Sequence, residues 1–345
     1  MKKLVALLLA VVMVFGLVAC SDTNTKTPTN GTEEQKNDKD YEIVVIAKNA
    51  ESTWGIRQEL GVKWFADETG INAYQVGPSS VDASVQLQLL EDAIAQGVDA
   101  ICIVPVDVES VESALERARK QGIIVIANEG TAVVNKDYSL DAFNNDAFGE
   151  FMMESLASQM GGSGEYTTMV GSLSNGSHSI WQDAGVAYAT EKYPDMTLLP
   201  DDPRVESNDD TEKAYEKTKE LLKKYPDLKG IVGASSADLP GIAKALEELD
   251  KVDTVFAAGL GTPNKCRQFL ESGTLKETCT WDPAGAGYAM CSLALKILQG
   301  ETVQDGMDLG IDGYHSITFS ADSSNCLEGA GMITITKDNV NDYDF

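Results

Sequence analysis

The stretch VQLQLLEDAIAQGVDAICIVPVDVESVESALERARKQGIIVIA, residues 85–127, repeats one pattern twice. Residues 85–96 and 108–120 carry apolar side chains at spacings of three and four, which predicts two amphipathic helices. Each helix is followed by a short run of mostly β-branched residues, at 100–104 and 123–127, which predicts buried strands. This alternation of helix and strand predicts a parallel sheet built from βαβ units.

The same alternation continues along the chain on both sides. Further strands are expected at 43–47, 72–76, 166–170, 198–199, 230–233, 254–258 and 275–280, and further helices at 147–160, 211–224 and 239–249. Gly97 and Gly122 follow two of the helices and suit the left-handed conformation that ends a helix. Because the series of strands restarts at Tyr166, we predict two doubly wound, Rossmann-like α/β lobes with a ligand cleft between them.

The boundaries of the two lobes follow from this pattern. We expect an N-terminal lobe of residues 41–142 plus 283–311 and a C-terminal lobe of residues 143–282 plus 312–345. A three-segment hinge would then join the lobes near 142–145, 280–283 and 310–314. A ligand that contacts both lobes would favour closure of this hinge.

The N-terminus has the features of a secretion signal. Lys2 and Lys3 precede an apolar run from Leu4 to Val18, which is shorter than the roughly 20 residues that span a bilayer. We therefore expect residues 1–19 to be a signal peptide. Residues 20–40 contain no apolar cluster and are expected to be a flexible tether.

The end of this signal is similar to the lipobox of bacterial lipoproteins. The sequence there is Leu17-Val18-Ala19-Cys20, and the resemblance implies that Cys20 becomes the lipidated N-terminus. Two acyl chains would hold the protein stably on the extracytoplasmic face of the cell membrane. The alternative is a secreted protein with a coincidental cysteine at the cleavage site.

Charge and cysteine usage exclude several classes of partner. The formal net charge is −27 with no compensating basic patch, so nucleic acid is not expected as a partner. No C-x-x-C arrangement occurs, and we expect no zinc site and no cofactor. Of the five cysteines after Cys20, Cys102 is expected in the core, and Cys279 could pair with Cys266 or with Cys291.

Several segments, in this order, carry a family resemblance. They are the segments 43–48, 86–105 and 121–126, followed by Tyr225-Pro-Asp-Leu228, Gly261-Thr-Pro-Asn264, Trp281-Asp-Pro283 and the end of the chain from Lys337 to Phe345. From Tyr41 to Phe345 the chain resembles the sugar-binding type I periplasmic binding proteins, most of all the autoinducer-2 and rhamnose receptors. The resemblance implies a monomeric substrate-binding lipoprotein that passes a small polar ligand to the permease of an ABC importer.

The resemblance also implies particular ligand-binding positions. In that group a lysine after the first strand and an acid after the fourth strand hold the ligand, and here Lys48 and Glu129 match them. An Asp-Gln pair of the group is replaced by Ser177-His178, and Ala234-Ser235-Ser236 replaces a stretch of different polarity. These departures argue against autoinducer-2 itself and leave another polyhydroxylated ligand plausible.

The ends of the predicted strands indicate the same ligand-binding region independently of the resemblance. Lys48, Asn128 and Glu129 end strands of the first lobe, and a carboxylate there could accept hydroxyl groups of a sugar. An ordinary surface lysine and a helix-capping acid are the alternatives. In the second lobe, Ser235 and Ser236 offer hydroxyls at another strand end, with helix capping as the alternative role.

Aromatic residues and one histidine complete the predicted site. Trp54, Trp181 and Trp281 fall at strand-end loops, where an aromatic face suits the C–H surface of a sugar ring, although at least one should only pack. His178 could donate or accept and would make affinity sensitive to pH, or could have no role. Asp282 lies beside Trp281 at a predicted passage between the lobes.

Two other classes of function are alternatives to the transport receptor. A secreted α/β enzyme is disfavoured because the chain has no G-x-S-x-G, no phosphate-binding loop and only two histidines, His178 and His315. A signalling receptor that presents its closed form to a sensor kinase fits the sequence equally well. The residues do not decide which ligand is bound.

Overall fold

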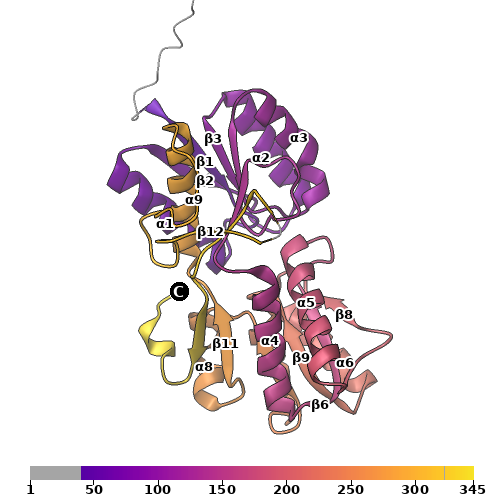
Figure 1. Ribbon diagram of the computed structural model, residues 1–345. Helices are drawn as coiled ribbons and strands as arrows, with labels where there is room; N and C mark the ends of the chain where they lie inside the picture. Colours follow the sequence, from indigo (N-terminus) through magenta and orange to yellow (C-terminus); the bar gives the residue numbers. More distant parts are fainter. Residues whose placement is uncertain (1–39, 322) are drawn as a thin grey trace, which may run out of the picture. The chain divides into compact units, whose positions relative to one another are not determined.

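The computed structural model describes residues 40–321 and 323–345 (Figure 1). The predicted signal peptide, the predicted lipidation site Cys20 and all of the predicted tether except Asp40 lie outside these residues. No helix in the described part of the chain is both long enough and apolar enough to cross a membrane.

The first sheet has seven strands in the order β12-β13-β5-β4-β3-β1-β2. Its strands are β1 (Glu42–Ile46), β2 (Asn72–Val76), β3 (Ala100–Ile103), β4 (Ile124–Ala127), β5 (Tyr138–Asp141), β12 (Thr318–Phe319) and β13 (Cys326–Glu328). All neighbouring strands run parallel except β12, which is antiparallel to β13. This order makes β1, β3 and β4 interior strands, where both faces of the sheet are covered.

Helices cover both faces of the first sheet. The side chains of each strand point alternately to the two faces, so each strand packs against helices on both sides. Ile43 and Val45 pack into the core shared with α1 (Thr53–Thr69) and α9 (Pro283–Leu298), whereas Val44 and Ile46 pack into the core beneath α2 (Ala83–Gln96) and α3 (Val108–Lys120). Figure 1 shows α9 beside α1 although they are far apart in sequence. A run of apolar residues without alternation is what a strand buried on both faces requires.

The second sheet is parallel, with the order β10-β9-β6-β7 and with β8 beside β6. Its strands are β6 (Ser163–Val170), β7 (Asp195–Leu198), β8 (Arg204–Glu206), β9 (Leu228–Gly233) and β10 (Phe256–Gly259). The helices of this lobe are α4 (Asn145–Met160), α5 (Gly176–Lys192), α6 (Thr211–Lys224), α7 (Asp238–Glu248) and α8 (Pro263–Ser272). A separate antiparallel pair, β11 (Glu277–Thr280) with β14 (Ile333–Thr336), and the short helix η2 (Val340–Asp342) follow. The predicted architecture of two α/β lobes is confirmed.

The chain passes between the two sheets three times, after β5, after β11 and after β13. The third passage differs from the sequence prediction, which assigned all residues from 312 onward to the second lobe. Leu327 of β13 pairs with Leu140 of β5, so the first sheet extends to residue 328. Strands of two and three residues carry no periodic signal, which is why the prediction placed this boundary near 310–314 rather than between 329 and 332.

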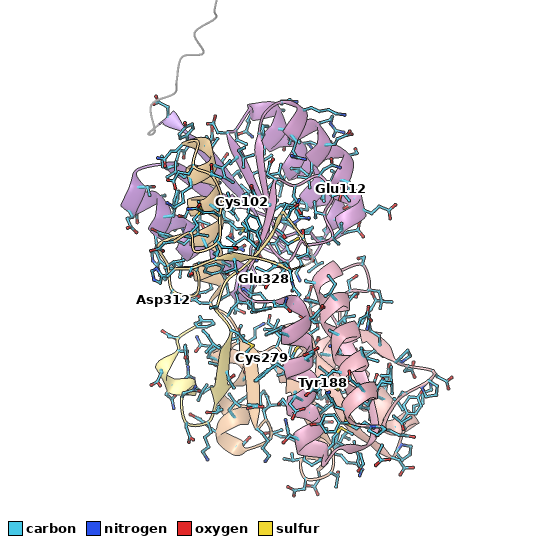
Figure 2. The ribbon with its side chains drawn as sticks, in the orientation of Figure 1. Cys102, Glu112, Tyr188, Cys279, Asp312 and Glu328 are labelled. Atoms are coloured by element: carbon cyan, nitrogen blue, oxygen red, sulfur yellow. The ribbon has the colours of Figure 1, made fainter. Side chains whose placement is uncertain are left out.

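The five described cysteines are all buried and unpaired. Cys102 lies on β3 and Cys279 on β11, in different sheets (Figure 2). Cys102 is fully buried in the core between the first sheet and α9, as expected. Neither of the two disulfides considered for Cys279 is present in the structure.

Candidate ligand-binding pocket

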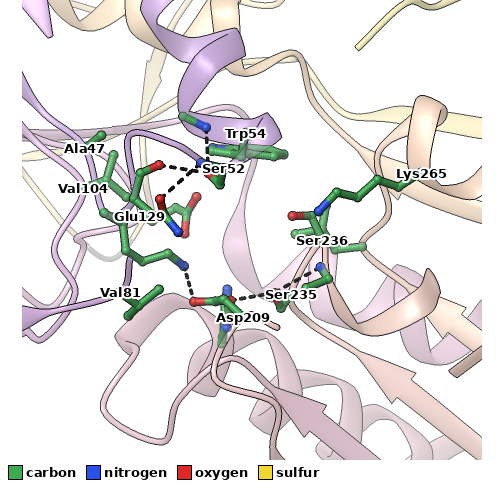
Figure 3. Close-up of a pocket in the computed structure, with 16 residues that line it drawn as sticks. Ala47, Ser52, Trp54, Val81, Val104, Glu129, Asp209, Ser235, Ser236 and Lys265 are labelled. Carbon is green, nitrogen blue, oxygen red and sulfur yellow. Dashed lines mark hydrogen bonds and ion pairs between the residues drawn. The ribbon is translucent and has the colours of Figure 1, made fainter. Parts of the chain in front are cut away.

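A pocket of about 610 Å³, a volume that includes its open mouth, lies where strands of both sheets end. Its lining residues from the first lobe are Ala47, Lys48, Asn49, Ser52, Trp54, Gly55, Val81, Val104 and Glu129, and those from the second lobe are His178, Asp209, Ser235, Ser236, Ala237, Leu260 and Lys265 (Figure 3). Both lobes therefore contribute charged and polar side chains to one cavity.

An ion pair joins the two lobes inside this pocket. Lys48 follows β1 of the first sheet, and its Nζ lies 3.2 Å from Oδ2 of Asp209, which follows β8 of the second sheet. Burial acts to lower the pKa of Lys48, but the negative charges of Asp209 and Glu129 outweigh it and leave the pKa above its usual value. The ammonium group therefore stays charged throughout the physiological range.

Asp209 is held from both sides. Ser235 Oγ donates a hydrogen bond of 2.5 Å to its Oδ1, and Lys48 contacts its other oxygen (Figure 3). Burial alone would raise the pKa of Asp209, but the charge of Lys48 and these bonds hold it at about 2. The carboxylate is thus ionised and already satisfied by the protein.

Glu129 follows β4 in an unusual backbone conformation with φ of 52°. A left-handed conformation costs a residue with a side chain roughly 1–2 kcal/mol. Asp141 supports it, because Oδ1 of Asp141 accepts the backbone N–H of Glu129 at 2.8 Å. Ser177 Oγ donates to Oε2 of Glu129 at a long 3.4 Å. Burial raises the pKa of Glu129 to about 6, although Lys48 opposes the shift.

His178 lies in the first turn of α5 and is buried. Its Nδ1 accepts the backbone N–H of Gly171 at 3.1 Å, so the neutral ring carries its hydrogen on Nε2. Among the described residues no group accepts a hydrogen bond from Nε2. Burial and the charge of Lys48 lower the pKa of His178 to about 3. The expectation that His178 makes affinity pH-sensitive near neutrality therefore does not hold, and the ring serves as a neutral donor.

A second carboxyl group supports the pocket from behind. Asp238, in the first turn of α7, accepts hydrogen bonds from Ser207 Oγ at 2.6 Å and from the backbone N–H of Ser235 at 2.9 Å. It is completely buried and does not line the pocket. Burial raises its pKa to about 7. Asp238 thus fixes the loop that carries Ser235 and Ser236.

Six of the ten residues predicted from sequence line this pocket: Lys48, Trp54, Glu129, His178, Ser235 and Ser236. The other four do not line this pocket. Asn128 donates to the carbonyl of Leu140 at 2.8 Å, which turns its amide into the first sheet. Trp181 donates to Asn145 at 2.5 Å within the second lobe.

Trp281 and Asp282 also have structural partners. Trp281 is 2% exposed and packs edge-on against Trp54, with ring centroids 4.5 Å apart. Asp282 caps α9 through the N–H of Ala284 and accepts two hydrogen bonds from Arg57, at 2.8 and 2.6 Å. Their position at a passage between the lobes was predicted, but this position serves packing and helix capping rather than the pocket.

Sequence reasoning missed Asn49, Ser52, Asp209 and Lys265 among the polar lining residues. Asn49 and Ser52 form the turn that caps α1, where Ser52 Oγ accepts the N–H of Gly55 at 2.9 Å. Asp209 could have been found only by recognising β8, a three-residue strand that it follows. Lys265 could have been suggested by Pro263, since proline in a first turn marks the start of α8.

Gly171 makes room for the ion pair. A Cβ atom at residue 171 would lie 2.1 Å from Oδ1 of Asp209, a severe overlap. We expect Gly171→Ala to lower the free energy of unfolding by about 1–3 kcal/mol, the usual cost of overpacking. Urea unfolding measures this change. Gly176→Ala is the matched control, because a Cβ there meets its nearest atoms at an ordinary 3.6 Å; equal stability of the two variants would contradict the prediction.

The described residues include no group of three or more His, Cys, Asp or Glu side chains that could hold a metal ion.

Comparison with known proteins identifies the family. Residues 43–302 match the family described as periplasmic binding protein domain, and the chain belongs to that family. It is 26% identical over 273 residues to the xylitol-binding protein of Mycolicibacterium smegmatis, covering 75% of this chain and 74% of that protein. It is also 24% identical over 314 residues to the ribose import binding protein of Bacillus subtilis, covering 88% and 96%.

Solved structures share the fold. LsrB from Clostridium saccharobutylicum in complex with AI-2 is 22% identical with a TM-score of 0.78, and the match covers 88% of this chain and 99% of that one. An ABC transporter solute binding protein from Clostridium phytofermentas with bound L-rhamnose is 20% identical with a TM-score of 0.79, covering 88% and 98%. The predicted fold and the family resemblance are both confirmed.

Proposed function

We propose that the protein is the extracytoplasmic substrate-binding component of an ABC importer and that it holds a sugar or sugar-like polar ligand between its lobes. The observation that carries this proposal is the pocket itself, where Lys48 and Glu129 of one lobe face Asp209, Ser235 and Ser236 of the other. Relatives named for xylitol and ribose support a polyhydroxylated ligand. Hydroxyl groups can both accept from Lys48 and donate to Glu129.

Closure of the hinge would couple binding to transport. A ligand in this pocket gains hydrogen bonds from both lobes only when they are together, so it favours the closed form over any open one. The permease would then distinguish loaded from empty protein by its closure. We propose a monomeric protein that binds its ligand and catalyses no reaction, in keeping with a family of binding proteins.

A thermal-shift screen tests the proposal. The purified protein is heated with monosaccharides, sugar alcohols, furanosyl signals such as autoinducer-2, nucleosides and amino acids. A ligand at one hundred times its dissociation constant should stabilise the protein by about 2.7 kcal/mol. Stabilisation by a sugar or polyol supports the proposal, a furanosyl signal alone would favour the signal-receptor alternative, and a shift only with nucleosides or amino acids would overturn the sugar assignment.

The lipid anchor is part of the same proposal. It rests on the Leu17-Val18-Ala19-Cys20 sequence, which lies outside the described residues. We expect Cys20→Ala to release the protein from the membrane fraction, because the anchoring acyl chains need the cysteine sulfur and amine. Fractionation of cells with immunoblotting measures this. Ser21→Ala is the matched control and should stay with the membrane; a Cys20→Ala protein that also stays there would contradict the lipid anchor.

A further inference from the structure

Lys265 differs from Lys48, the other lysine of the pocket, because it has no ion-pair partner among the described residues. Lys48 is paired with Asp209, but no described carboxylate lies within ion-pair distance of Lys265 Nζ, and no described group accepts a hydrogen bond from it. The side chain is nevertheless half-buried against the pocket. The chain carries 54 acidic residues against 27 basic ones, so an unpaired cation in a cleft is unusual here.

The surroundings of Lys265 strengthen its positive character. It lies in the first turn of α8, where the helix dipole adds a partial positive charge. Thr262, the cap residue of this helix, is buried, and its Oγ1 has no partner among the described residues. Burial lowers the pKa of Lys265, and the charges of Asp209 and Asp210, which act to raise it, do not offset the loss of water.

The open hydrogen-bonding groups of the pocket are mostly donors. Lys265 offers its ammonium group, His178 offers Nε2–H, and Trp54 offers an indole N–H that has no acceptor among the described residues. Asp209 is already occupied by Lys48 and Ser235. Glu129, with one long bond to Ser177, is the carboxylate left to accept from a ligand. A donor-rich pocket matches a ligand rich in acceptors.

The charges are also separated across the pocket. Figure 3 shows Lys265 on one side of the cavity and Glu129 on the opposite side, each contributed by a different lobe. A ligand bound between them would therefore place an anionic group toward Lys265 and hydroxyl groups toward Glu129. A carboxylate is the smallest group that supplies both a negative charge and acceptor oxygens without a donor.

We propose that the ligand is a sugar acid, a polyhydroxylated molecule such as a uronate or an aldonate, and that Lys265 binds its carboxylate. This inference rests on the proposed function, since it names the ligand class of the same pocket. Lys265 then acts as the residue that distinguishes acidic from neutral sugars. Its charged bond to the ligand is formed only when the second lobe closes over the first.

Calorimetric titration tests the inference with matched ligands. Glucuronate and galacturonate are compared with glucose, galactose and glucosamine, and gluconate is compared with the polyol sorbitol. We expect at least one acid to bind at least tenfold more tightly than its neutral counterpart and to weaken as salt is added, because the contact is ionic. Lys265→Gln should weaken binding of that acid at least tenfold, and Lys265→Arg should retain most of it.

Lys337→Gln is the matched control, since Lys337 is exposed and has no ion pair among the described residues. It should bind the acid as the unaltered protein does. Neutral sugars that bind while their acids do not would overturn the inference and leave the proposed function standing. An acid whose affinity is the same in Lys265→Gln and Lys337→Gln would also overturn it. A protein that binds no sugar, sugar acid or polyol at all would overturn both.

Discussion

Replacing Trp281 with alanine is expected to lower the free energy of unfolding by about 3–5 kcal/mol, the usual cost of deleting a large buried aromatic side chain. Trp281 is 2% exposed and packs against Trp54, Phe143, Phe148 and Trp181, with ring centroids 4.5–5.9 Å away. This aromatic cluster lies where the chain passes between the two sheets. Urea unfolding followed by circular dichroism measures the loss.

The conservative variant separates packing from ligand contact. Trp281→Phe keeps an aromatic ring in the cluster and should retain most of the stability that Trp281→Ala loses. It should also bind the ligand with unchanged affinity, because Trp281 does not line the pocket. A tenfold loss of affinity in Trp281→Phe would restore the sequence-based assignment of this residue to the site, and an alanine variant as stable as the unaltered protein would contradict the packing role.

The second large effect concerns Glu129 and pH. Its pKa is about 6 in the ligand-free protein, and hydroxyl groups of a ligand donate stronger hydrogen bonds to the ionised form of Glu129 than to its protonated form. Binding is therefore strongest above about pH 7 and weakens as pH falls through 6, by up to tenfold for each unit below the pKa. Titrations between pH 5 and 8 measure this dependence. Glu129→Gln should bind at least tenfold more weakly at pH 8, with little change as the pH is lowered.

Other ionisable groups near the pocket provide the controls. Asp209, with a pKa of about 2, and His178, with a pKa of about 3, keep their charge states across this range. Asp238 has a pKa of about 7 and lies behind Ser235, so it could mimic the effect. Asp238→Asn should retain the loss of affinity below pH 6. If the pH dependence disappears in Asp238→Asn and persists in Glu129→Gln, the assignment to Glu129 is wrong.

Many of the regular elements of the fold were readable from sequence because their burial is periodic, but the bounds of α1, α5, α8 and α9 were not predicted. The predicted strand 72–76 and the predicted helices 108–120 and 211–224 have the observed bounds. Strands β5, β8, β12, β13 and β14 were not recognised. They have two to four residues, too few for a periodic pattern, and their pairing depends on neighbours that are distant in sequence.

Pocket residues that lie at the ends of strands could be predicted from the sequence. The direction in which a side chain points at a strand end could not. Lys48 and Glu129 each lie two residues after a strand of the first sheet with a strong sequence signal, and both line the pocket. Asn128 is adjacent to Glu129 and yet turns into the sheet, because neighbouring side chains near a strand end point in different directions. Asp209 lies in the loop after β8 and Lys265 in the first turn of α8, and the positions of both are set by the second sheet as a whole.

A crystal structure of the protein with the ligand found in the thermal-shift screen tests the central claim most directly. The account predicts the ligand between the lobes, with hydroxyl groups on Lys48 and Glu129 and with its opposite end near Ser236 and Lys265 of the second lobe. A ligand that contacts only one lobe, or that lies outside this pocket, would contradict the account.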